Sequence, residues 1–151
     1  MKRKMITDKL KELGYDYQPA PIEVFDFHQA VRTGNLVYTS GQVSGLGDLI
    51  IKGKVGEDVD LETAYKAAEI CAYRCLMAVG AVADVNDINK IVKVLGMVNV
   101  GAGFDNTSGV INGATHFLNK IFEGNHARSA VGMVIPANWA VEIEMVAEIR
   151  D

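Results

Sequence analysis

Hydrophobic positions recur at helical spacing in two long stretches of the chain. In the first, small apolar residues follow the helical repeat up to Val79, and Asp60 precedes them as a typical N-cap. The second stretch begins after Thr107 or Ser108, either of which can cap it, and it ends before Gly124. The pattern therefore predicts two amphipathic helices, one after Asp60 up to about Val79 and one between Thr107 and Gly124.

Six further stretches are rich in β-branched and aromatic residues and predict strands. The clearest is 91–100, which is apolar on both faces for much of its length and so indicates a central, covered strand. The other predicted strands are 24–31, 36–40, 49–51, 127–135 and 140–149. This order of elements predicts an α+β fold, in which one sheet carries two helices on one face.

Two helices on one face leave the other face of such a sheet uncovered. Tyr38, Val134 and the second face of strand 91–100 would then form an exposed apolar surface. Large apolar surfaces mark interfaces, and closed cyclic symmetry is the usual way in which identical chains bury them. The sheet pattern therefore predicts a homo-oligomer.

Length and charge exclude several classes of protein. A chain of 151 residues with 49% hydrophobic and 23% charged residues is typical of a single globular domain. Its net charge of −4 argues against a protein whose main task is to hold nucleic acid, and the basic start at residues 2–4 is too short to change this. There is no apolar run long enough for a signal peptide or a membrane span, so we expect a cytoplasmic protein without membrane or nucleic-acid partners.

The two cysteines and three histidines give no metal or disulfide signature. Cys71 and Cys75 stand one helical turn apart in the apolar stripe of the first long helix, which predicts buried core residues. A metal pair at the cysteines would need further ligands, and the histidines are scattered along the chain. We therefore expect no metal site.

Two charges stand where strands would more cheaply carry apolar residues. Arg128 lies at the start of strand 127–135, and Glu142 lies inside strand 140–149. A guanidinium can bind a carboxylate through two parallel hydrogen bonds, and a nearby carboxylate can orient or deprotonate water. The pair is compatible with a site for a small organic acid. Charges on the solvated face of a strand are the simpler interpretation, and the residues alone leave both open.

Four segments of the chain resemble the reactive-intermediate deaminase family, also called YjgF-type or endoribonuclease L-PSP-like. The resemblance spans about residues 24 to 149, and it rests on the order of these segments more than on any one of them. They are GNLVYTSGQ at 34–42, VIN at 110–112, ARSAV at 127–131 and VEIE at 141–144. We accordingly divide the chain into an N-terminal extension at 1–22, with a helix at 4–13 and a linker, and a YjgF-type domain at 23–151.

The resemblance implies a chorismate-mutase-like fold and a homotrimer whose three sheets form an inner barrel. It also implies ligand clefts between neighbouring subunits. Active members hydrolyse reactive enamine and imine acids, such as 2-aminoacrylate, to a keto acid and ammonia, and they need neither a metal nor an organic cofactor. A small carboxylate metabolite is therefore the implied ligand.

The resemblance also implies roles for individual residues. Arg128 would hold the substrate carboxylate, and Glu142 would orient or deprotonate the attacking water. Backbone groups of Gly41 and Ala130 would offer hydrogen bonds, and Asn112 would contribute a side-chain amide. An imine is already electrophilic, so positioning it beside one water captures much of the available rate gain.

Two positions depart from the family pattern. Phe27 stands where many members have Tyr, and Ala130 stands where many have Cys. Phe27 and Ser40 complete the predicted substrate-binding set, and His28 and His126 are candidates for the rim of the pocket. The loss of the Tyr hydroxyl at Phe27 favours a second hypothesis, a non-catalytic protein of the same fold that binds small carboxylates. A ribonuclease, the activity in the older family name, is disfavoured by the acidic net charge.

The spacing of Arg128 and Glu142 raises a geometric question. If the last two strands formed a plain hairpin that turned near Ala137 and Asn138, Arg128 would lie opposite Ala147 and far from Glu142. The two charges could share a ligand if the strands were not neighbours, or if two subunits contributed to one site. The sequence leaves both possibilities open.

Overall fold

The computed structural model describes residues 3–22 and 26–150, and its main sheet has the order β1-β2-β8-β6-β7, with β3 also paired to β8. The strands of this sheet are β1 Ala30–Thr33, β2 Leu36–Thr39, β3 Gln42–Val43, β6 Ile88–Asn99, β7 Ala127–Met133 and β8 Val141–Ile149. A separate hairpin is formed by β4 Gly45–Leu46 and β5 Leu49–Ile50. The predicted 91–100 strand is β6, which lies between β8 and the edge strand β7 and begins three residues earlier than predicted; the central strand of the sheet is β8.

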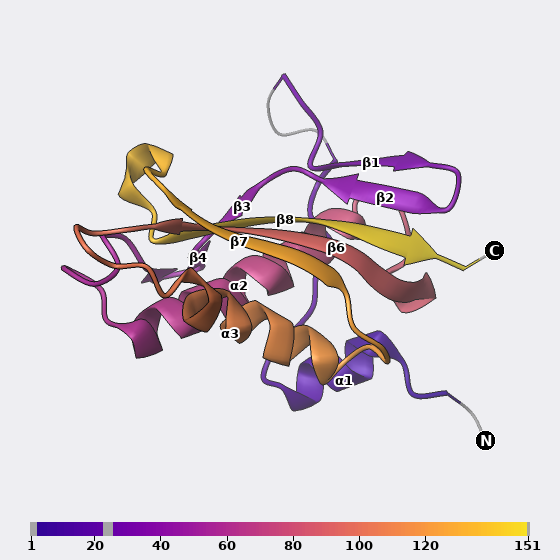
Figure 1. Ribbon diagram of the computed structural model, residues 1–151. Coiled ribbons are helices and arrows are strands. Elements are labelled where there is room, and N and C mark those ends of the chain that lie inside the picture. The colour runs from indigo at the N-terminus through magenta and orange to yellow at the C-terminus, as the bar shows by residue number, and fades with distance from the viewer. Residues whose placement is uncertain (1–2, 23–25, 151) are drawn as a thin grey trace.

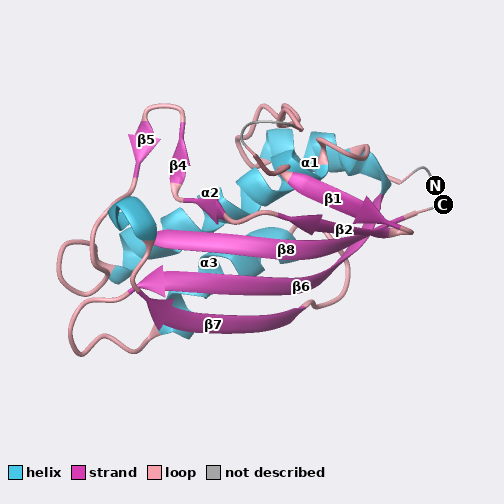
Figure 2. Ribbon diagram, turned by 90° about the horizontal axis from the view of Figure 1, so that it is seen from above, coloured by secondary structure: helices cyan, strands magenta, loops and turns pink. Residues whose placement is uncertain are grey.

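The helices α2 Leu61–Val79 and α3 Thr107–Asn119 lie on one face of the sheet, and the short helix α1 Ile6–Glu12 lies at one end of the same layer (Figure 1). Seen from above, the strands lie in front of the helices, and no helix covers the near face (Figure 2). Two short 3-10 turns, η1 Val85–Asp87 and η2 Pro136–Asn138, precede β6 and β8. The predicted α+β fold with one covered sheet face is confirmed.

The N-caps explain where the two long helices begin. The Asp60 side chain accepts a hydrogen bond of 2.8 Å from the Thr63 amide, as the sequence predicted. The second helix is capped by Asn106, whose side chain accepts from the Gly109 amide at 3.1 Å. The predicted caps Thr107 and Ser108 are therefore wrong by one or two residues, because a side-chain amide one position earlier satisfies the free N–H groups.

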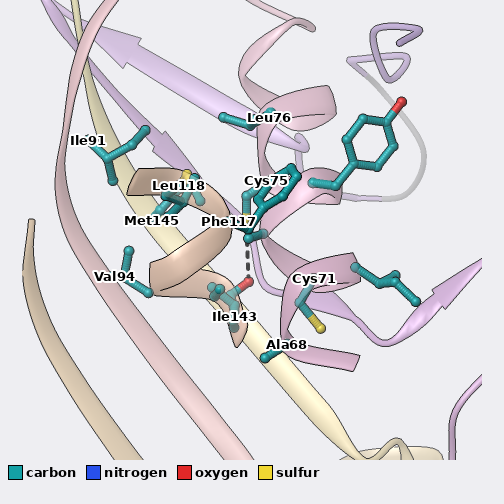
Figure 3. Packing of buried hydrophobic residues seen from close by; sticks show 14 of the residues in the cluster. Ala68, Cys71, Cys75, Leu76, Ile91, Val94, Phe117, Leu118, Ile143 and Met145 are labelled. Atoms are coloured by element: carbon teal, nitrogen blue, oxygen red, sulfur yellow. Dashed lines mark hydrogen bonds between the residues drawn. The ribbon is translucent and has the colours of Figure 1, made fainter. Parts of the chain in front are cut away.

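Small residues allow α2 to lie directly on the sheet. Cys71 and Cys75 are fully buried free thiols, and the Cys75 Sγ donates to the Ile143 carbonyl of β8 at 3.3 Å (Figure 3). Phe117 and Leu118 from α3, together with Val94 of β6, fill the space beside α2 (Figure 3). The two cysteines are core residues, as expected from their helical spacing.

Two glycines bring α3 into closer contact than any side chain would permit. A Cβ at Gly113 would lie 1.9 Å from the backbone oxygen of Tyr65 in α2. A Cβ at Gly96 of β6 would lie 2.6 Å from the Ile111 side chain of α3. The backbone of α3 is thus seated against both α2 and β6, and this seating determines where the outer side chains of α3 reach.

The strand prediction for 24–31 is wrong over residues 26–29 and correct over 30–31. β1 begins only at Ala30 and runs to Thr33; residues 26–29 form bends and a single bridge, and residues 23–25 lie outside the described part of the chain. The four residues of β1 are those that pair with the four of β2, so regular pairing ends where β2 ends. The remaining strand predictions differ from the structure mainly at their ends, by one to three residues.

The uncovered face of the sheet carries exposed apolar side chains, as the sequence predicted, together with acidic side chains of β8. Exposed large apolar residues on or beside it are Val31, Tyr38, Val131, Met133 and Val134.

In the described part of the chain, no helix is long and apolar enough to cross a membrane.

The N-terminal segment packs on the helix layer. Ile6 and Leu10 of α1 are buried, and the Tyr15 ring stacks on Tyr73 of α2 at a centroid distance of 4.3 Å. The Tyr15 hydroxyl donates to the Glu69 carboxylate. The described part of the 1–22 extension therefore shares one core with the rest of the chain.

Candidate functional site

Arg128 is anchored on the helix-covered side of the edge strand β7. Its Nη1 donates to Asn112 Oδ1 at 2.8 Å and to Thr115 Oγ1 at 3.0 Å. Asn112 and Thr115 are three residues apart on α3 and so lie on one face of that helix. The structure thus brings together two of the predicted residues, Arg128 and Asn112, and adds Thr115, which sequence reasoning did not single out.

Both hydrogens of Arg128 Nη1 are used in the hydrogen bonds to Asn112 and Thr115. Among the described residues, none accepts a hydrogen bond from Nε or Nη2 of Arg128, and none forms an ion pair with it. Nε and Nη2 form one complete edge of the guanidinium, the geometry that binds a carboxylate through two parallel hydrogen bonds. Arg128 is therefore fixed on one side and available on the other.

A polar hollow of about 300 Å³ surrounds this guanidinium. It is lined by Asn112, Thr115, Asn125, His126 and Arg128. His126 Nε2 lies 3.0 Å from Thr115 Oγ1. Burial and the nearby charge of Arg128 lower the pKa of His126, which favours its neutral ring. The neutral ring can accept a hydrogen bond from the Thr115 hydroxyl, while the oxygen of that hydroxyl accepts one from Arg128. His126 lines this hollow, and its role at the rim of a substrate pocket stays a prediction.

Glu142 belongs to a second cluster, on the uncovered face. Its neighbours Val141 and Ile143 are buried toward the helices. Because successive side chains of a strand point to opposite faces of the sheet, the Glu142 side chain lies on the uncovered face. A Cβ at Gly41 would lie 2.2 Å from Glu142 Oε2, so only glycine permits this carboxylate to lie against the backbone there. No described residue donates a hydrogen bond to the carboxylate. It is therefore available to water or a ligand.

Burial raises the pKa of the Glu142 carboxyl above that of an ordinary glutamate, and the charge of Glu144 on the same face raises it further. A carboxylate with a raised pKa is a stronger base at neutral pH than a solvated one. Sequence reasoning did not single out Glu144 for this effect on Glu142, although their i, i+2 spacing on one strand places the two side chains on one face.

The remaining predicted residues divide between the two clusters. Ser40 lies beside Gly41, and its hydroxyl donates to the His28 carbonyl at 2.7 Å. Phe27 is in the preceding bend and is 57% exposed. Ala130 lies on β7 two residues after Arg128, and its carbonyl accepts from the Thr107 hydroxyl at 3.0 Å.

Within one chain, Arg128 and Glu142 cannot share a small ligand. β6 lies between their strands, pairing Arg128 with Val94 and Glu142 with Met97. This separates the two Cα atoms by about 10 Å along the strands and about 10 Å across them. The side chains also leave opposite faces of the sheet. β7 and β8 are not neighbours, so the hairpin alternative is excluded, but their separation does not bring the charges together.

The described residues contain no group of three or more His, Cys, Asp or Glu side chains placed to hold a metal ion.

Comparison with known proteins places the chain in a family. The family model described as endoribonuclease L-PSP matches residues 18–149. Protein TCP17 of Trypanosoma cruzi is 27% identical over 97% of this chain and 95% of its own length. The crystal structure of Atu1372 from Agrobacterium tumefaciens, a protein of unknown function, is similar with a TM-score of 0.86 at 35% identity, over 97% of this chain and 94% of that one. The YjgF gene product of E. coli is similar with a TM-score of 0.60 at 26% identity, over 87% of this chain and 94% of that one. The chain therefore belongs to the YjgF-type, endoribonuclease L-PSP family.

Proposed function

We propose that this protein hydrolyses reactive enamine and imine carboxylic acids of the 2-aminoacrylate and 2-iminopropionate class to a keto acid and ammonia. Family membership suggests a deaminase or small-molecule-binding role. The observation that carries the more specific proposal is the free Nε–Nη2 edge of Arg128, which is held at Nη1 by Asn112 and Thr115. A guanidinium fixed in this way is preorganised for one carboxylate.

In the proposed site, Arg128 of one subunit and Glu142 of its neighbour face one ligand. Arg128 lies on an edge strand, and Glu142 lies on the uncovered apolar face, so an adjoining subunit can approach both. A trimer that buries these faces would join the two clusters in each of three clefts. The same assembly would remove the apolar face from water.

The proposed reaction needs one positioned water. The enamine tautomerises to the imine, and water adds to the imine carbon while Glu142 accepts a proton from it. Glu142 passes that proton to the nitrogen, which gives the carbinolamine. The C–N bond then breaks as the hydroxyl proton moves through Glu142 to the nitrogen, so that ammonia leaves and the keto acid remains. Arg128 holds the carboxylate throughout, so the chain contributes orientation and one base.

The direct test generates 2-aminoacrylate in place with a pyridoxal-phosphate lyase and measures ammonia and keto-acid release. We expect release to accelerate in proportion to the amount of this protein. Binding of stable small carboxylates without any acceleration would instead support the non-catalytic binding protein, which the exposed Phe27 in place of the family's Tyr favours.

Replacing Glu142 by glutamine is expected to abolish the acceleration without lowering stability at neutral pH. The folded pKa of Glu142 is raised, so its contribution to stability is complete below the unfolded pKa and is lost as pH rises through the folded pKa. Glutamine cannot ionise, so Glu142→Gln should unfold at the same or a higher temperature than the wild type at pH 8. Rates and unfolding curves from pH 5 to 8 check this, and a variant that retains the wild-type rate would remove Glu142 from the mechanism.

Val131→Asp is expected to convert the trimer to monomers. Val131 is 39% exposed on the uncovered face, so a charge there costs little in an isolated chain but is expensive in a buried apolar interface. Leu61→Asp is the matched control, because Leu61 is 42% exposed at the start of α2, on the opposite side of the sheet. Light scattering of both variants gives the mass. Equal masses for Val131→Asp and the control would show that this face is not the interface.

A further inference from the structure

Basic side chains from three segments of the chain, the N-terminal residues 3–9, the start of β6 and the residue after β8, converge on one hollow that is distinct from the two clusters described above. The hollow has a volume of about 540 Å³ and lies at the end of the sheet where both chain termini emerge (Figure 1). Its basic lining residues are Arg3, Lys4, Lys9, Lys90 and Arg150. It shares no residue with the hollow around Arg128.

Hydrogen bonds hold two of these cations in place. Lys9 Nζ donates to the Ile121 carbonyl at 2.9 Å. Arg150 Nη2 donates to Asn89 Oδ1 at 3.3 Å, and Asn89 Nδ2 in turn donates to Glu148 Oε1 at 2.7 Å. The hollow thus has a fixed polar floor, and it is not formed only by mobile surface lysines.

The charges at this hollow are not balanced by the protein. Its lining contains five cations and one carboxylate, Glu123. Lys4 is paired with Glu12, whereas neither Arg3 nor Lys90 forms an ion pair with any described residue. The whole chain carries a net charge of −4, so a local excess of positive charge is contrary to its average composition. Like charges held close together repel, and a bound anion would relieve that repulsion.

Four of the five cations lie outside the segment that the family model matches. Arg3, Lys4, Lys9 and Arg150 all fall outside residues 18–149, and only Lys90 falls within them.

We propose that this hollow binds a small polyanion that carries a di- or triphosphate group. Several lysines supply point charges, and Arg150 supplies a planar fork, which is the combination that phosphate oxygens favour. The volume is that of a small-molecule site. Several phosphate charges on one ligand match the number of cations better than a single carboxylate does.

Isothermal titration calorimetry of the full chain with inorganic pyrophosphate and with ATP, at constant ionic strength, tests the proposal. We expect one saturable site per chain, and at least roughly tenfold weaker binding in Lys90→Ala and in Arg150→Ala. Lys52→Ala is the matched control, because Lys52 lies over the Trp139 ring and outside this hollow. The Lys52→Ala variant should bind pyrophosphate and ATP with the affinity of the wild type.

Three outcomes would overturn the proposal. The first is the absence of saturable binding of either phosphate ligand. The second is equal affinity in Lys90→Ala and Lys52→Ala, which would assign any binding to general surface charge; Lys90 is exposed, so its variant is expected to fold. The third is citrate binding as tightly as pyrophosphate, which would assign the hollow to carboxylates. None of these results depends on deaminase activity.

Discussion

Replacing Arg128 by alanine is expected to lower kcat/KM for 2-aminoacrylate hydrolysis about a hundredfold. The substitution removes a charged donor pair from the substrate carboxylate and leaves that carboxylate without its partner, a loss of about 3 kcal/mol. It also leaves Asn112 and Thr115 without the donor that they now share. Ammonia release by wild type and variant, with hydrolysis in buffer alone subtracted, measures the effect.

The Arg128 prediction separates a substrate role from a structural one. Arg128→Lys keeps the charge but cannot present a planar edge, so we expect it to recover only a small part of the rate. The oligomer of Arg128→Ala should be intact, because the proposed interface rests on apolar residues of the uncovered face. A monomeric Arg128→Ala would show that Arg128 is structural, and an unchanged rate would show that the substrate binds elsewhere.

Replacing Gly113 by alanine is expected to destabilise the protein by about 3 kcal/mol and to lower Tm by roughly 10 °C. The added Cβ would lie 1.9 Å from the Tyr65 backbone oxygen, so α3 must move away from α2. A backbone atom cannot rotate aside as a side chain can. The displacement would loosen the contacts that bury Phe117 and Leu118 between the helices and the sheet.

Gly113 also lies between the two residues that hold Arg128. Asn112 and Thr115 would move with α3, so Gly113→Ala should lower kcat/KM even at temperatures where the variant is folded. Asn119→Ala, an exposed change on the same helix, is the control and should alter Tm by no more than about 2 °C. A Tm for Gly113→Ala within that range would contradict the close packing of α2 and α3.

Local patterns in the sequence were sufficient for most of the secondary structure. Asp60 begins α2 because its side chain satisfies a free amide of the first turn, a contact that depends on residues only three apart. The apolar run of β6 indicated a strand inside the sheet, and β6 does lie between β8 and β7 with the helix layer on one face. The predicted central position, covered on both faces, is wrong, because β8 is the central strand and no described helix covers the other face (Figure 2). The family resemblance rested on short segments of the same kind, and the family assignment is confirmed.

The start of β1 could not be derived in the same way. Val24 to Val31 has the composition of a strand, but a strand forms only where a partner strand supplies hydrogen bonds, and β2 offers four residues. The cap of α3 at Asn106 was likewise decided by competition between neighbouring polar residues that the pattern could not rank.

The spacing of nearby residues was sufficient to predict the helices, the interior strand β6, the exposed apolar positions of the uncovered face and the residue types of the candidate site. Only the tertiary structure decided that β6 separates Arg128 from Glu142, that Thr115 anchors Arg128, and that Lys9, Lys90 and Arg150 meet in one hollow. These relations join residues far apart in the chain. They arise from strand order and from the seating of α3 on Gly96 and Gly113, which no local pattern encodes.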